Sequence, residues 1–251
     1  MRTTMALSAM LACLPALAQE GSENPPVPRP RPPELTTPAQ EPIRPAWTIR
    51  EATVDAPAPL PAAPPRDYQV ACPAVLQGKV EARMLPPLSD GQCGAQSPLE
   101  LSAVLANGRM VPLSGAITTD CGMATAMPEW IAAVDSYLMA RENTTIAELV
   151  VGTSYMCRKV NNAAEGNLSF HAFADAIDVV GFRLEDGRTV TVEADWAEAP
   201  SSEGRLLRYA HGAACSHFTT VLGPEANALH HDHFHLDLGC HGKTCTARLC
   251  E

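Results

Sequence analysis

The sequence predicts an α+β fold in which helices flank a small antiparallel sheet, with disulfides stapling the domain. Two observations lead to this class. The expected strands come mostly as hairpins, and strands and helices do not alternate regularly, which argues against a parallel α/β sheet. The chain also carries nine cysteines, eight of them in its globular part.

The first expected elements are a hairpin, a strand and a helix. Residues 99–113 alternate around Asn107-Gly108, a dipeptide typical of a two-residue hairpin turn. Residues 115–120 form a further strand. Residues 128–143 have the apolar spacing of an amphipathic helix, with Pro128 suited to its first turn.

The second half is expected to continue with hairpins and one more helix. Residues 146–155 are apolar and β-branched, as in a strand, and 176–184 with 188–194 read as a hairpin. A helix over 201–215 and an alternating strand over 232–238 complete the domain.

The first eighteen residues have the features of a secretory signal peptide. Arg2 precedes an apolar run, and "ALA" at 16–18 matches a cleavage site. The run is too short to cross a bilayer, so no transmembrane span is expected. A lipid attachment site at Cys13 is the weaker alternative. The net charge of −10 argues against nucleic acid as a partner.

Residues 19–67 form a proline-rich segment that we expect to be a disordered linker. It holds 14 prolines in 49 positions, a composition that favours extended polyproline II and cannot bury a core. The linker serves as a tether or spacer, or as the ligand of a partner domain. The globular domain is expected to span 68–251.

Cleavage of the leader removes Cys13 and leaves an even number of cysteines. An even count in an exported chain predicts disulfides, whose pairing the sequence leaves open among 105 possibilities. The disulfide candidates are Cys72, Cys93, Cys121, Cys157, Cys215, Cys240, Cys245 and Cys250.

One candidate half-site lies in "LSFHAFADAIDVVGF", which holds His171 and Asp178. On one continuous helix their spacing of seven would place both on one face. The alternative is a short helix, with Asp178 beginning the strand that follows. In either case a carboxylate inside "AIDVV" needs a partner, because burying a lone charge is costly.

The other half-site is "HHDHFHLD" at 230–237, which holds four of the chain's eight histidines. In a strand, His233, His235 and Asp237 share one face, while the apolar residues between them face a core. Histidines and an aspartate suit zinc, and a catalytic zinc site keeps one position for water. A further side chain must then handle protons.

These residues resemble two families. Ser169-x-His171 and Ala176-x-Asp178, followed by His233-x-His235, resemble the zinc peptidases that include lysostaphin, the D-Ala-D-Ala carboxypeptidases and the penicillin-insensitive murein endopeptidase. The chain from about Cys72 onward also resembles the bacterial extensin-like C-terminal domain family. "SYMCRKVNN" and "VLGPEANALHHDHFHLDL" carry that second likeness.

The resemblance to the peptidases implies a role for each matching residue. The zinc ligands would be His171, Asp178 and His235, and His233 would assist catalysis, with Asp232 the second choice. Arg158 would orient a substrate carboxylate, and His230 would support substrate binding.

Two departures from the peptidase pattern matter. Ala174 stands where the family has glycine, and a positive φ there would cost alanine about 1 kcal/mol. Asp232 stands where the carboxypeptidases have glutamate. Ser169 is expected to cap the turn that carries His171.

The resemblance therefore implies an exported zinc peptidase that hydrolyses peptidoglycan stem peptides or cross-links in the periplasm of a Gram-negative bacterium. The alternative is a non-catalytic, zinc-containing module that binds the cell wall. A serine hydrolase using Ser154 or Ser169 is a third reading, although the chain lacks a G-x-S-x-G elbow.

Overall fold

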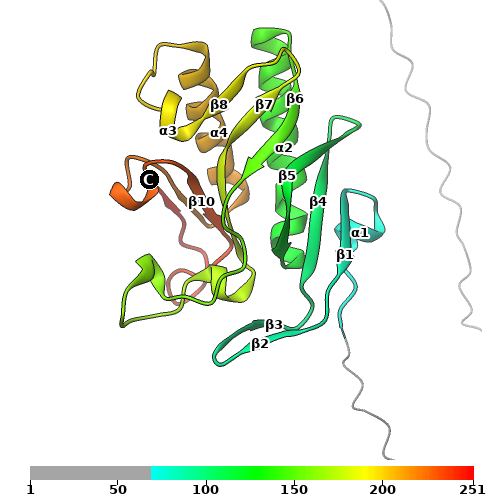
Figure 1. Cartoon of the computed structure of the whole chain (residues 1–251), viewed down its shortest axis with the longest axis vertical. Helices are drawn as coiled ribbons and strands as arrows, with labels where there is room; N and C mark the ends of the chain where they lie inside the picture. The colour runs from blue at the N-terminus through cyan, green and yellow to red at the C-terminus, as the bar shows by residue number, and fades with distance from the viewer. Residues whose placement is uncertain (1–68) are drawn as a thin grey trace, which may run out of the picture. The chain divides into compact units, whose positions relative to one another are not determined.

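A computed structural model describes residues 69–251 of the chain (Figure 1). The predicted signal peptide (1–18) and the predicted proline-rich linker (19–67) lie outside the described residues. The main sheet has nine strands in the order β1-β4-β5-β6-β7-β10-β9-β11, with β8 paired to β7. The fold thus combines a large sheet with helices, as an α+β domain.

The first part of the sheet is antiparallel and was largely predicted. β1 (Val80–Met84), β4 (Leu99–Ala106) and β5 (Arg109–Thr119) pair in succession. The β4–β5 turn is Asn107-Gly108, whose φ angles of 48° and 82° confirm the predicted hairpin. Residues 115–120, expected as a separate strand, mostly continue β5.

The prediction of a small antiparallel sheet was wrong in size and in part in strand direction. β5 pairs parallel with β6 (Ile146–Val151) through Leu113 and Leu149, and β9 (Thr220–Leu222) pairs parallel with β11 (Leu249–Cys250). The physical reason for the first pair is a crossover, because helix α2 (Cys121–Glu142) connects β5 to β6 and reverses the chain before the next strand.

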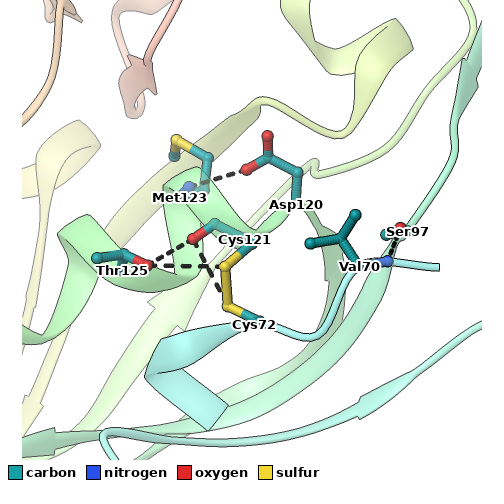
Figure 2. Close-up of a disulfide and its surroundings, with 7 residues drawn as sticks. All are labelled: Val70, Cys72, Ser97, Asp120, Cys121, Met123 and Thr125. Atoms are coloured by element: carbon teal, nitrogen blue, oxygen red, sulfur yellow. Dashed lines mark hydrogen bonds between the residues drawn. A yellow bond between two sulfur atoms is a disulfide. The ribbon is translucent and has the colours of Figure 1, made fainter. Parts of the chain in front are cut away.

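Helix α2 begins seven residues before its predicted start. Asp120 is its N-cap and accepts a hydrogen bond from the Met123 amide at 2.8 Å, so Pro128 lies inside the helix rather than in its first turn. Figure 2 shows this cap beside the disulfide that ties the first turn of α2 to Cys72, just before α1 (Pro73–Leu76). The cap and the disulfide together fix where the helix starts.

The remaining elements surround β7 (Ala176–Leu184), which lies in the middle of the sheet. The predicted helix at 201–215 is confirmed as α4 (Ser202–His217), which packs against α2, and the Trp130 indole N–H donates to the Ala210 carbonyl oxygen at 2.9 Å. The predicted strand at 188–194 is shorter, because α3 (Val192–Asp195) follows β8 (Thr189–Thr191) directly.

Short elements complete the described chain. β2 (Leu88–Asp90) and β3 (Cys93–Ala95) form a separate hairpin, which Figure 1 shows at one end of the sheet beside the segment between β6 and β7. That segment holds η1 (Val160–Asn162) and η2 (Phe170–Phe173), and η3 (Ala228–His230) precedes β10 (Phe234–Asp237).

All eight candidate cysteines form disulfides. The pairs are Cys72–Cys121, Cys93–Cys157, Cys215–Cys250 and Cys240–Cys245. Four disulfides are typical of proteins that leave the reducing cytoplasm. Within residues 69–251, no helix has the length and the apolar composition that crossing a bilayer requires.

Candidate metal centre

The register of two neighbouring strands brings the two candidate half-sites together. β10 pairs antiparallel with β7, and His235 lies directly opposite Asp178. His171 lies in η2, immediately before β7. The structure therefore selects the second of the two sequence readings, a short helix followed by a strand that contains Asp178.

Three donor atoms converge in this corner of the sheet. His171 Nε2 lies 3.1 Å from Asp178 Oδ1 and 3.1 Å from His235 Nδ1, and His235 Nδ1 lies 3.2 Å from Asp178 Oδ1. All three residues are buried. Zinc binds such atoms at about 2.0–2.1 Å in a tetrahedral arrangement, which separates the ligand atoms by about 3.3 Å. The donor set and its spacing fit a zinc ion.

The other ring nitrogens of both histidines have acceptors that fix their tautomers. His171 Nδ1 lies 2.6 Å from the Ser154 carbonyl oxygen, and His235 Nε2 lies 2.9 Å from Asp237 Oδ2. Because these partners can only accept, the histidines donate there, and the other nitrogen of each ring is the one that a metal would take when it displaces any proton there. Gly239 N donates to Asp237 Oδ1 at 2.9 Å and holds that carboxylate in place.

Burial and charge act in opposite directions on the cluster. Burial raises the pKa of Asp178, but the hydrogen bonds with His171 and His235 outweigh it and hold the pKa below its ordinary value. Burial lowers the pKa of His235, yet Asp178 and Asp237 together raise it to about 9. The two buried carboxylates thus favour a positive charge at this point, which is the electrostatic condition for binding a cation.

His233 lies beside the three donors and does not join them. Its Nε2 lies 3.5 Å from Asp178 Oδ1, and its Nδ1 lies 2.7 Å from Asp232 Oδ1. The group whose ligand atoms all lie within 4.8 Å of one another contains His171, Asp178 and His235 alone among residues at this site in the described chain. The site therefore consists of three candidate metal ligands, with His233 beside them and outside the group. Asp232 lies behind His233 and has no hydrogen bond with His235.

His230 flanks the same site. Its ring centre lies 5.3 Å from that of His233 and 5.9 Å from that of His235, and its Nδ1 lies 3.0 Å from Asn227 Oδ1. Burial, together with the charges of His235 and His233, lowers its pKa to about 4, so His230 is neutral near pH 7. His231, by contrast, is largely exposed.

A cleft of about 480 Å³ opens onto the cluster, and both predicted substrate-binding residues line it. Arg158 and His230 share this cleft with Asp178, His233 and His235. Within residues 69–251, the Arg158 guanidinium has no ion pair or hydrogen bond to another side chain. The structure thus leaves a cationic group available beside the candidate metal centre.

Neither Ser154 nor Ser169 forms a serine triad with His171. Both nitrogens of His171 are engaged, one by the Ser154 carbonyl oxygen and one within the cluster, while the Ser154 hydroxyl accepts from the Thr118 amide. Ser169 occupies the N-cap of η2, but its side chain makes no capping hydrogen bond, so the predicted cap was wrong in that respect. Its carbonyl oxygen accepts from the Ala172 amide instead.

Ala174 and Asp237 are the informative residues around the ligands. Ala174 ends η2 with φ 59° and ψ 19°, a left-handed conformation that favours glycine and costs alanine energy. Sequence reasoning placed Asp237 on the histidine face but gave it no role. The signal was available, since Asp237 follows His235 by two residues in a strand.

A second group of metal-binding residue types is already committed to a disulfide. His211, Cys215 and Cys250 lie close together, but the two cysteines are bonded to each other. This group therefore offers no thiolates as ligands in the oxidised protein.

Fold and site together define a disulfide-bonded α+β domain with a buried His–Asp–His cluster at the base of a cleft. The chain belongs to the family of the extensin-like protein C-terminus, whose family model matches residues 70–251. No curated protein and no solved structure matches the chain. The likeness to zinc peptidases therefore rests on the motif residues alone.

Proposed function

We propose that this protein is a zinc-dependent peptidase that hydrolyses peptide bonds in the stem peptides or cross-links of peptidoglycan. The observation that carries the proposal is the three-ligand cluster of His171, Asp178 and His235, with His233 beside it and a cleft in front. Structural zinc sites are usually closed by four protein ligands, whereas catalytic sites have three. The motif likeness to peptidoglycan peptidases supports the substrate class.

The residues around the cluster have separable roles in this proposal. When bound, zinc supplies a Lewis acid and lowers the pKa of water to near neutrality. His233 Nε2 faces the reaction site, where the ring in its imidazolium form would donate to the oxygen of the peptide carbonyl as negative charge develops there. Asp232 accepts from His233 Nδ1 and so fixes which nitrogen faces the substrate.

Substrate binding is assigned to the two other polar groups of the cleft. Arg158 would bind a carboxylate of the stem peptide, since a guanidinium matches that group in shape and charge. Neutral His230 would hydrogen-bond to the peptide backbone. The peptide is thereby held with its scissile carbonyl at the cluster.

The cellular site that fits this proposal is the periplasm of a Gram-negative bacterium. The predicted signal peptide and the four disulfides support export to an oxidising compartment. The proline-rich linker would tether the domain, or bind a partner, within reach of the wall.

Digestion of purified muropeptides tests the proposal. The wild-type protein should bind one zinc ion per chain and cleave a stem or cross-link peptide, and His171→Ala should lose both properties. Equal turnover by wild type and variant would refute the mechanism. Chromatography of the products would identify the bond that is cleaved.

A non-catalytic wall-binding module is the second candidate, and one observation favours it. Asp232, the counterpart of the carboxypeptidase glutamate, lies behind His233 and contributes no carboxylate in front of the cluster. Under this reading the protein binds zinc and sediments with purified peptidoglycan, yet releases no product from any muropeptide.

A further inference from the structure

We propose that the Cys93–Cys157 disulfide holds one wall of the cleft in position. In this role it raises the affinity for substrate, and metal binding does not depend on it. We call this wall, residues 156–168, the flap. The identity of the substrate rests on the proposed function above. The positioning role itself rests on how the flap is held in the fold.

The flap has no hydrophobic anchor of its own. None of its side chains is buried, and Met156 and Val160 are each 47% exposed. Its regular structure is the 3₁₀ turn η1 and one isolated bridge between Lys159 and Leu168. A segment with so few buried contacts has low local stability unless a crosslink constrains it.

The flap nevertheless supplies much of the cleft surface. Met156, Arg158 and Val160 line the cleft, as do Asn161 and Asn162. Cys157 lies between the first two of these residues in sequence and is bonded to Cys93. Cys93 is buried in β3, so the disulfide joins an unanchored wall to an ordered hairpin. The crosslink lies next to Arg158, the residue whose placement matters most for an anionic ligand.

The side chains of the metal ligands are held by contacts outside the flap, although the flap reaches the backbone of η2 through two hydrogen bonds, from the Met156 amide to the His171 carbonyl oxygen and from the Ser169 amide to the Arg158 carbonyl oxygen. His171 follows the flap in sequence. Its ring is hydrogen-bonded to the carbonyl oxygen of Ser154, a residue that precedes the flap. After His171, the Ala174 carbonyl oxygen accepts from the Asp120 amide at 2.8 Å. Asp178 and His235 are paired within the main sheet. Opening the flap therefore leaves the three ligand atoms with their own supports.

Two other disulfides also lie next to residues that line the cleft, whereas the Cys72–Cys121 disulfide does not. His241 and Leu249 line the cleft, and each lies next to a disulfide cysteine, Cys240 and Cys250 respectively. The neighbours of Cys72 and Cys121 do not line it, and Figure 2 shows that pair beside the N-cap of α2. The disulfides whose neighbouring residues line the cleft thus differ from Cys72–Cys121, which lies at the start of α2 and away from the cleft.

A pair of double variants tests the inference in the full-length protein. Cys93→Ser with Cys157→Ser removes the flap crosslink, and Cys72→Ser with Cys121→Ser is the matched control. The measurements are zinc content, KM and kcat on a purified muropeptide, and hydrogen exchange of peptides covering 156–168 and 176–184.

The flap variant should keep one zinc ion per chain and show faster exchange in 156–168 but not in 176–184. Its KM should rise about tenfold with a smaller change in kcat, because ordering several free side chains opposes binding. The control variant should melt at a lower temperature with exchange in 156–168 and KM unchanged.

Two results would overturn the inference. One is loss of zinc from the flap variant, which would make the disulfide part of the support of the metal centre. The other is a hydrogen-exchange rate in 156–168 of the flap variant that equals the rate in the wild-type protein. If the wild-type protein cleaves no muropeptide, the proposed function fails, while zinc content and hydrogen exchange still decide the role of the disulfide.

Discussion

Replacing Asp237 by asparagine should weaken zinc binding through the protonation of His235, without removing a ligand. Asp237 Oδ1 accepts from the Gly239 amide and Oδ2 accepts from His235 Nε2, both at 2.9 Å. The oxygen of an asparagine must face Gly239 N–H, because a backbone amide can only donate. Its NH₂ group then faces His235 Nε2, which can accept only if the ring proton moves to Nδ1. Nδ1 is the atom that faces His171 and Asp178.

The size of this effect follows from the loss of an outer hydrogen-bond partner. Such losses typically lower metal affinity about 10- to 100-fold. That range corresponds to about 1.4–2.7 kcal/mol of binding free energy. The assay is competition for zinc between the protein and a chromophoric chelator near neutral pH.

A matched control separates this effect from a general loss of charge. Asp232→Asn alters the carboxylate partner of His233, which is outside the three-ligand group, and should leave zinc affinity unchanged while lowering kcat. Wild-type zinc affinity in a folded Asp237→Asn protein would refute the reasoning about the tautomer of His235.

Three further predictions concern stability. Ala174→Gly should raise the free energy of unfolding by up to about 1 kcal/mol in urea denaturation, because Ala174 has φ 59°; a lower stability would show that its buried methyl group matters more. Burial and the charge of Asp120 raise the pKa of Asp175 to about 7. The folded state therefore holds this proton more tightly than the unfolded chain, and the stabilisation is lost as pH rises through about 7. Unfolding free energy should fall between about pH 4 and pH 7, from the ordinary pKa of an aspartate to the raised one, and Asp175→Asn should remove that fall; an unchanged profile would contradict the assignment. Cys72→Ser with Cys121→Ser should lower stability by about 4 kcal/mol for a loop closed at a separation of 49 residues; an unchanged melting temperature would contradict it.

Local patterns in the sequence predicted the half-sites well. The alternation placed His235 and Asp237 on one face of β10, but the predicted strand over 232–238 was too long, because β10 begins at Phe234 and His233 precedes it. The apolar run around Asp178 indicated a buried strand, which is β7. Both patterns are short and depend only on neighbours in the chain. A cost at Ala174 was expected only if φ were positive there, and the structure gives the angle, a φ of 59°.

The long-range features could not be read from the chain. The pairing of His235 with Asp178 depends on strand register across 57 residues, and no local pattern specifies it. The size of the sheet was missed because β5 and β6 pair in parallel only after α2 has carried the chain back along the sheet, and no local pattern specifies that return. The start of α2 was missed because its first two residues, Cys121 and Gly122, are weak helix formers, and the Asp120 N-cap and the Cys72–Cys121 disulfide define the start instead.

The central claim of the account is a metal centre with three protein ligands and one side open to the cleft. Anomalous diffraction at the zinc edge, from crystals of the zinc-loaded protein, tests it most directly. The account predicts one zinc ion bound by His171 Nε2, Asp178 and His235 Nδ1, with His233 beside it and not bound. A zinc ion closed by four protein ligands, or no zinc at these residues, would contradict it.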